Sequence, residues 1–179
     1  MYIQIYILSK LMEGKCYPYN VIKSLTEKFL FNEFARMAES KLYYHFESLV
    51  KQGLIEAVEV AKESHQPEQN LYEITQKGVE ELPKKIYKLF ERAVSLPEML
   101  TGFFCIHHVE SSRVIEILEQ RIDQIYVKSS RISQLHSSIN TKGSNQKVIE
   151  IYADFFKDRF ESEIEALSAL IANLKKGQI

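Results

Sequence analysis

Residues 39–75, ESKLYYHFESLVKQGLIEAVEVAKESHQPEQNLYEIT, contain the pattern that decides the fold. Their first part predicts a helix over about residues 39–52, because apolar residues recur there at helical spacing, namely Leu42, Phe46, Leu49 and Val50. Gly53 is a typical residue after a helix end. The branched run 54–60 and the run 70–74 predict two strands, and the polar stretch 62–69 between them predicts a turn. This stretch therefore predicts a helix followed by a β-hairpin.

The N-terminal segment is apolar and precedes a helix end at Gly14. Residues 2–12 carry an apolar stripe at helical spacing, although the alternation of Ile3, Ile5 and Ile7 also permits a strand. We expect a helix here and keep the strand as the alternative.

Further helices are predicted on both sides of the decisive stretch. Pro18 lies in the expected first turn of a second helix, and residues 29–37 are expected to pack as a connector. Thr75 is a suitable N-cap for a helix that follows the hairpin. Three helices, a hairpin and a helix are the order of a winged helix, a variant of the helix-turn-helix.

The second half of the sequence predicts helices alone. Leu96-Pro97 marks a boundary, so we expect a winged-helix domain over 1–92 and a helical domain over 93–179. The expected elements are a short helix over 99–109, a heptad helix over 111–139, a loop over 140–145 and a last helix. The predicted fold class is mainly α with a small β-hairpin, a winged helix-turn-helix domain followed by long C-terminal dimerisation helices.

The charge balance excludes one class of protein. The chain has 179 residues and a formal net charge of -1, which excludes a uniformly basic nucleic-acid coat protein. Charge is nevertheless segregated: residues 1–53 carry seven basic and five acidic side chains, a net of +2, whereas residues 54–74 carry one lysine and five glutamates, a net of -4. A DNA-binding module therefore remains compatible with the composition.

Cysteine content and motifs predict a cytoplasmic protein that is not an enzyme. Cys16 and Cys105 are too few for a disulfide framework, so we interpret them as reduced thiols. The first residues lack the pattern of a signal peptide or a membrane span, and we expect no membrane partner. Cys105-x-His107-His108 lacks a second cluster, so no metal and no cofactor are expected. No nucleophile-elbow, phosphate-loop or paired-histidine zinc motif occurs.

The helix over 39–52 has a polar face opposite its apolar stripe. That face offers lysine, histidine and tyrosine side chains, which can contact phosphates, sugars and base edges in a major groove. An ordinary solvated helix face is the alternative interpretation, and spacing alone leaves the two equally supported.

Four motifs, in order over about residues 5–90, resemble the PadR family of transcriptional regulators. They are Ile7-Leu8 with Leu11-Met12-Glu13-Gly14, then Tyr17-Pro18-Tyr19-Asn20-Val21-Ile22, then Ser40-Lys41-Leu42-Tyr43 leading to Gln52-Gly53-Leu54-Ile55, and Tyr72-Glu73-Ile74-Thr75 with Lys77-Gly78. The resemblance implies a winged-helix dimer that represses promoters, often its own and that of a detoxification or efflux gene. It also places Tyr19 and Tyr43 at tyrosines of the family's motifs.

The candidate DNA-binding residues combine this resemblance with the polar helix face. They are Tyr17, Tyr19, Ser40, Lys41, Tyr43, Tyr44, His45, Lys51 and Lys62. The acidic hairpin is the unusual feature, because phosphates repel it. It favours the alternative function, a helical adaptor or ligand-sensing protein on a winged-helix scaffold that binds no DNA.

The C-terminal helices supply the candidate dimer interface and a speculative effector site. We expect a homodimer, because a palindromic operator needs a two-fold protein, while packing within one chain is the alternative. The expected interface residues are Ile115, Leu118, Ile122, Ile125, Ile132, Ile139, Phe156, Phe160, Ile164 and Leu167. The candidate site for a small hydrophobic or aromatic effector consists of Phe103, Phe104, Tyr152 and Phe156. Packing of these aromatic residues in the core is the more ordinary interpretation.

Overall fold

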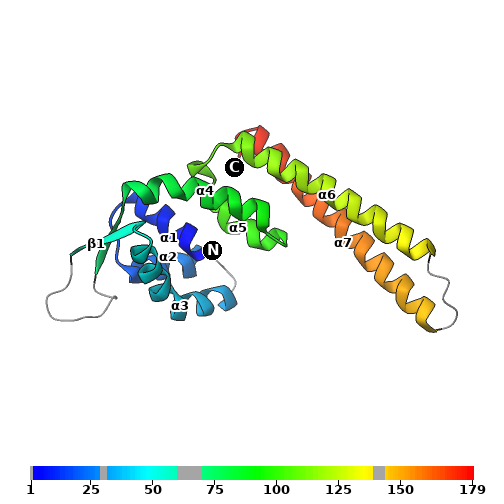
Figure 1. The fold of residues 1–179 in the computed structure, drawn as a ribbon, viewed down its shortest axis with the longest axis horizontal. Helices are drawn as coiled ribbons and strands as arrows, with labels where there is room; N and C mark the ends of the chain where they lie inside the picture. Colours follow the sequence, from blue (N-terminus) through cyan, green and yellow to red (C-terminus); the bar gives the residue numbers. More distant parts are fainter. Residues whose placement is uncertain (1, 29–31, 60–69, 139–143) are drawn as a thin grey trace. The chain divides into compact units, whose positions relative to one another are not determined.

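A β-hairpin follows three helices in the first of two units of the computed structural model (Figure 1). The structure describes residues 2–28, 32–59, 70–138 and 144–179. The elements of the first unit, Met1–Val109, are α1 (Tyr2–Glu13), α2 (Pro18–Lys28), α3 (Asn32–Lys51), β1 (Ile55–Glu59), β2 (Leu71–Ile74), α4 (Gln76–Arg92), α5 (Leu96–Phe104) and the 3-10 turn η2 (Ile106–His108). This order confirms the predicted mainly helical winged-helix fold with a small hairpin.

The helix α1 lies at the centre of the first unit and packs against α3, α4, α5 and β2. Its buried residues point in all directions around the helix and comprise Ile3, Ile5, Tyr6, Ile7, Leu8, Ser9 and Leu11. A helix that is apolar on all sides shows no single stripe. This explains why the sequence also permitted a strand here.

The hairpin is antiparallel and is extended by a third short segment. Ile55 pairs with Ile74 and Ala57 pairs with Tyr72, with an irregularity before Glu59. The backbone of Cys16 exchanges two hydrogen bonds of 3.1 Å with Tyr72 on the other side of β2. The segment between α1 and α2 thereby completes the sheet of the winged helix.

The helix α3 starts earlier than expected. Its first residue is Asn32 rather than a residue near Glu39, so the expected connector is wrong for residues 32–37, while residues 29–31 lie outside the described part. The three-residue spacing of Phe31, Phe34 and Met37 already fits a helix.

The junction between the hairpin and α4 is closely packed. The Thr75 hydroxyl accepts a hydrogen bond of 3.1 Å from the Gly78 amide, which confirms the predicted N-cap. It also donates one of 2.8 Å to the Gly53 carbonyl oxygen. A Cβ at Gly78 would collide with the Leu54 carbonyl oxygen and lie 2.6 Å from Ile74 Cγ1. Glycine at this position therefore lets α4 approach the hairpin.

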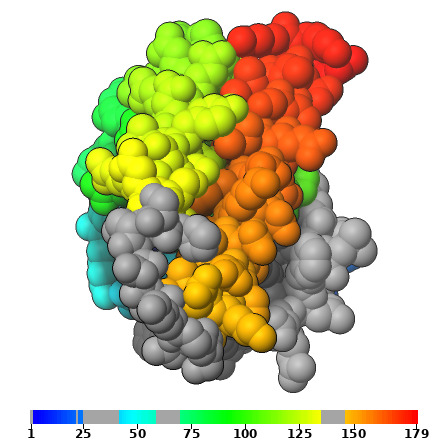
Figure 2. Space-filling view, turned by 90° about the vertical axis from the view of Figure 1, so that its right-hand side faces the viewer, coloured from blue at the N-terminus to red at the C-terminus, as the bar shows by residue number. Residues whose placement is uncertain are grey.

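The second unit, Glu110–Ile179, contains α6 (Ser111–Ser138) and α7 (Ser144–Lys175), which lie side by side along their lengths (Figures 1 and 2). Arg121 contacts Glu163 at 2.7 Å and Lys175 contacts Glu119 at 2.9 Å, so an early part of α6 meets a late part of α7 and the pair is antiparallel. The heptad helix is confirmed to Ser138. The expected loop begins outside the described residues, and its last two positions belong to α7.

The two units divide after Val109, whereas the sequence suggested a boundary after residue 92. The cause is α5, which packs against α1 and α4 and places Met99 and Gly102 in the first core. The short helix expected over 99–109 occurs as α5 and η2 in succession. Within the described residues, no helix has the length and apolarity needed to span a membrane.

Replacing Gly78 with alanine should lower the free energy of unfolding by about 1–3 kcal/mol, because the added methyl group must displace backbone at Leu54. Urea unfolding followed by circular dichroism measures this. The exposed neighbour Gln76 provides the control, since Gln76→Ala should change stability by less than about 0.5 kcal/mol. Equal stability of Gly78→Ala and the wild type would contradict the close approach.

Candidate nucleic-acid interface

The second half of α3 has one buried face and one exposed face. Leu42, Phe46 and Leu49 are 0% exposed and fix the helix on the core. Tyr44 is 69% exposed, and Lys51 is also exposed. The predicted division into an apolar stripe and an accessible aromatic and cationic face is therefore present at these positions.

The remaining predicted residues of α3 are less exposed or fall outside the description. Tyr43 and His45 are partly buried at the flanks of the exposed face, and the rings of Tyr44 and His45 meet edge to face at 5.7 Å between centroids. Ser40 and Lys41 belong to α3, but their side chains are not among those described. They remain predictions.

The helix α2 adds a second accessible group next to α3, against which it packs. Tyr17 precedes α2 and is 41% exposed, whereas Tyr19 lies in its first turn and is 64% exposed. Lys23 follows Tyr19 by four residues, is also exposed, and therefore shares its face. Lys23 is absent from the residues predicted from the sequence, although its spacing of four from Tyr19 could have identified it.

Acidic side chains limit the positive charge of this surface. Glu47 is exposed one helical turn before Lys51 on the same face of α3. In the hairpin, Glu56 lies opposite Glu73, and Lys15 neutralises Glu73 through an ion pair of 2.8 Å. Lys62 lies outside the described residues. The described part of the hairpin thus contributes no unpaired cation of its own.

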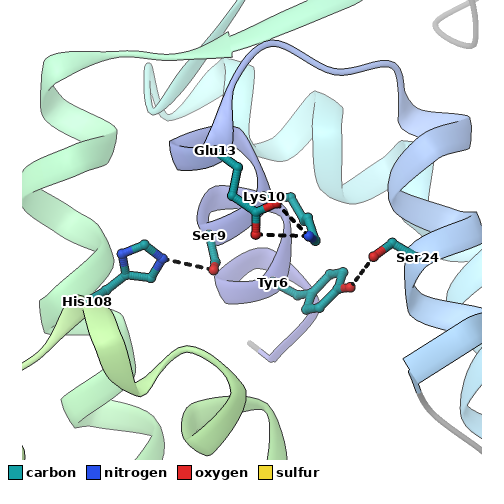
Figure 3. A network of polar contacts seen from close by, with 6 residues as sticks. All are labelled: Tyr6, Ser9, Lys10, Glu13, Ser24 and His108. Carbon is teal, nitrogen blue, oxygen red and sulfur yellow. Dashed lines mark hydrogen bonds and ion pairs between the residues drawn. The ribbon is translucent and has the colours of Figure 1, made fainter.

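Polar side chains of α1 contact α2, η2 and one another (Figure 3). The Tyr6 hydroxyl is 2.7 Å from Ser24 Oγ, which connects α1 with α2. Ser9 Oγ is 2.9 Å from His108 Nε2, which connects α1 with η2. Lys10 forms an ion pair of 2.7 Å with Glu13 within α1.

A small cleft of about 180 Å³ lies where α1 ends and α2 begins, beside Cys16. Burial raises the pKa of the Cys16 thiol to about 11, so the thiol stays protonated at neutral pH and is a poor nucleophile. The residues that the structure describes contain no group of three histidine, cysteine or acidic side chains suited to a metal ion.

The predicted interface residues of the second unit differ in burial. Leu118, Ile125 and Leu167 are buried in the second unit, where α6 packs against α7 of the same chain. Those that are only partly buried are Ile115, Ile122, Ile132, Phe156, Phe160 and Ile164, while Ile139 lies outside the described residues.

The four residues assigned to an effector belong to separate units. Phe103 packs edge to face on Phe90 at 5.0 Å, and Phe104 follows it at the end of α5. On α7, the ring centroids of Tyr152 and Phe156 are 6.5 Å apart. Core packing accounts for Phe103.

One stretch of the first unit is similar to a known protein family. Residues 7–84 match the family described as "Transcriptional regulator PadR-like family". Residues 7–84 are thus similar to the domain of PadR-like transcriptional regulators. This confirms the resemblance drawn from the four motifs. The PadR-like family consists of DNA-binding transcription regulators and not of enzymes.

Solved structures of PadR regulators are similar to this chain. Bacillus subtilis PadR in complex with operator DNA is 16% identical, with coverage of 96% of this chain and 98% of that chain and a TM-score of 0.38. A PadR-like transcriptional regulator from Bacillus cereus is 18% identical, with coverage of 98% and 99% and a TM-score of 0.37. Bacillus subtilis PadR in complex with p-coumaric acid is 15% identical, with coverage of 98% and 99% and a TM-score of 0.36. Among curated proteins, none matches the chain significantly.

The stability of the first unit should fall as the pH drops below about 6.5, the usual pKa of histidine. Burial, with a smaller effect of His107 and an opposing one of Glu13, lowers the pKa of His108. Protonation below pH 6.5 therefore favours the unfolded chain, and the stabilisation is complete only above that pH. Urea unfolding at pH 7.5 and 5.5 should show a smaller difference for His108→Gln than for the wild type.

The exposed neighbour His107 supplies the control for this measurement. His107→Gln leaves the burial of His108 intact and should keep most of the difference between the two pH values. An unchanged pH dependence in His108→Gln would show that other groups cause it.

Proposed function

We propose that this chain is a cytoplasmic, homodimeric transcriptional repressor that binds a palindromic operator through the exposed face of α3. The observation that carries the proposal is the orientation of α3 within a PadR-like domain, with Leu42 and Phe46 buried and Tyr44 and Lys51 accessible. A tyrosine hydroxyl and a lysine can bind phosphates while the tyrosine ring packs on sugars. Tyr19 and Lys23 of α2 extend the same chemistry.

The second unit supports a dimer through an exposed apolar face of α7. Its residues follow each other at intervals of three, one and three, are all more than half exposed, and comprise Val148, Ile151, Tyr152 and Phe155. A continuous apolar face of this kind is typical of an interaction site. We assign it to a second copy of the chain, because two half-sites of a palindrome require a two-fold assembly.

A small hydrophobic or aromatic effector fits the same unit. The rings of Tyr152, Phe155, Phe156 and Phe160 form a continuous series along α7, with centroid separations of 5.5 to 6.5 Å. A flat ligand among these rings would change how two α7 helices pack. The spacing of the two α3 helices would then no longer match the distance of about 34–36 Å between successive major grooves, and the operator would be released.

DNA affinity should respond in opposite directions to two substitutions on one face of α3. Lys51→Gln should weaken binding to the DNA upstream of the gene and reduce the salt slope by about 0.9, because one phosphate contact is lost. Glu47→Gln should strengthen binding, because it removes a charge that phosphates repel. Fluorescence anisotropy at several salt concentrations measures both.

Lys157→Gln, an exposed lysine of α7, is the control and should leave affinity and salt slope unchanged. The repressor proposal is wrong if the wild-type dimer binds the upstream DNA no better than unrelated DNA and no co-effector is required. The acidic hairpin would then favour the adaptor function.

A negative charge within the exposed face of α7 should separate the dimer. Ile151 is 67% exposed in the single chain, so Ile151→Glu costs the monomer little, whereas burying the carboxylate in a dimer is unfavourable. Sedimentation equilibrium should show a shift from dimer to monomer.

Lys157→Glu introduces the same charge nine residues from Val148, on the opposite side of α7, and should remain dimeric. A dimer of unchanged strength in Ile151→Glu would place the interface elsewhere.

A further inference from the structure

Gln4 is a polar residue of α1 that reaches two other helices. Its amide nitrogen Nε2 donates to Ser48 Oγ of α3 at 3.3 Å. Its amide oxygen Oε1 accepts from Lys85 Nζ of α4 at 3.4 Å. Gln4 is partly buried, whereas Ile3 and Ile5 on either side of it in sequence are buried.

The chemistry of Lys85 sets the direction of the Gln4 amide. An ammonium group only donates hydrogen bonds, so the amide oxygen must face Lys85 and the NH₂ group must face Ser48. Lys85 is partly buried, and burial lowers its pKa, which indicates that its ammonium group has lost part of its hydration. A partly desolvated cation holds an acceptor more firmly than a cation in water does.

Ser48 lies on the flank of α3 next to the candidate DNA-binding face. It follows Tyr44 by four residues, so both project from the same side of the helix. Ser48 Oγ also accepts from Gln52 Nε2 at 3.0 Å, and Lys77 Nζ of α4 donates to the Gln52 carbonyl oxygen at 2.7 Å. The end of α3 is thus connected with α4 both through Gln4 and directly.

The apolar stripe of α3 and its polar flank restrict different movements. Burial of Leu42, Phe46 and Leu49 is non-directional and fixes how deeply α3 sits on the core. A hydrogen bond depends on angle as well as distance, so a contact on the flank resists rotation of the helix about its own axis. Rotation of α3 would turn Tyr44 and Lys51 away from a groove.

We propose that Gln4 is a positioning residue that fixes the rotation of α3, through Ser48, relative to α1 and α4. The inference rests on the proposed function for its effect on DNA affinity. A residue remote from DNA would thereby determine how well the exposed face of α3 fits an operator. A change transmitted along α4 to Lys85 would reach the same face.

The test is Gln4→Leu, which keeps an apolar core of similar volume and removes both hydrogen bonds. Operator affinity should fall about threefold to tenfold, because one or two hydrogen bonds no longer favour the orientation of α3 that fits a groove. The dimer mass and the affinity for unrelated DNA should stay near those of the wild type, whereas the urea midpoint should fall modestly, because Ser48 and Lys85 each lose a hydrogen-bond partner. Gln4→Glu, in contrast to Gln4→Leu, should keep operator affinity near that of the wild type, because a carboxylate accepts from both Lys85 and the Ser48 hydroxyl.

A double-mutant cycle distinguishes positioning from general weakening. Ser48→Ala should add no further loss of operator affinity in the Gln4→Leu background, because the two residues act through one contact. Additive losses, or a loss of affinity that parallels a loss of stability across the variants, would overturn the proposal. If Gln4→Leu is unstable, the double variant with Lys85→Met replaces it. This variant also lacks the ammonium group that has lost Gln4 as its acceptor.

Hydrogen exchange provides a readout that does not depend on DNA. In Gln4→Leu, the amides of residues 48–52 should exchange faster than in the wild type, whereas those of α7 should be unchanged. Unchanged exchange at residues 48–52 would refute the positioning role. If the wild type binds no operator and these amides still respond, the proposed function fails while the positioning role stands.

Discussion

The burial of α1 on nearly every side is the constraint on which the first unit depends. Its apolar side chains provide a non-directional attraction to α3, α4 and α5. Its few polar side chains then give direction, since Gln4 contacts α3 and α4, Tyr6 contacts α2, and Ser9 contacts η2. The first unit is therefore organised around one helix, and the helices proposed to meet DNA are both held by it.

Local patterns in the sequence were sufficient for most of the first unit. The stripe of α3, the hairpin and the Thr75 cap were predicted because each depends on residues close together in the chain. The strand alternative for α1 arose because a helix buried on all sides lacks a period of its own. The role of Gly78 was not predictable, since it depends on Leu54, which lies far away in sequence.

The candidate site was predicted in part for the same reason. Tyr44 and Lys51 follow from the position of the apolar stripe, whereas Gln4 acquires its role only when α1, α3 and α4 are packed together. In α7, apolar residues repeat every four positions from Val148 to Ile164, and this period drifts by about 40° per step around a helix of 3.6 residues per turn. This series therefore begins exposed at Val148 and Tyr152 and becomes partly buried at Phe156 and Phe160, before Leu167 is fully covered.

The connection of Cys16 with Tyr72 has a mechanical consequence. Two backbone hydrogen bonds and the ion pair between Lys15 and Glu73 fasten the strand β2 to the segment that leads into α2. A force that bends the hairpin is thus transmitted to the first turn of α2, which carries Tyr19. The orientation of the first turn of α2 is therefore coupled to that of β2 through main-chain contacts, independently of the charge that the hairpin carries.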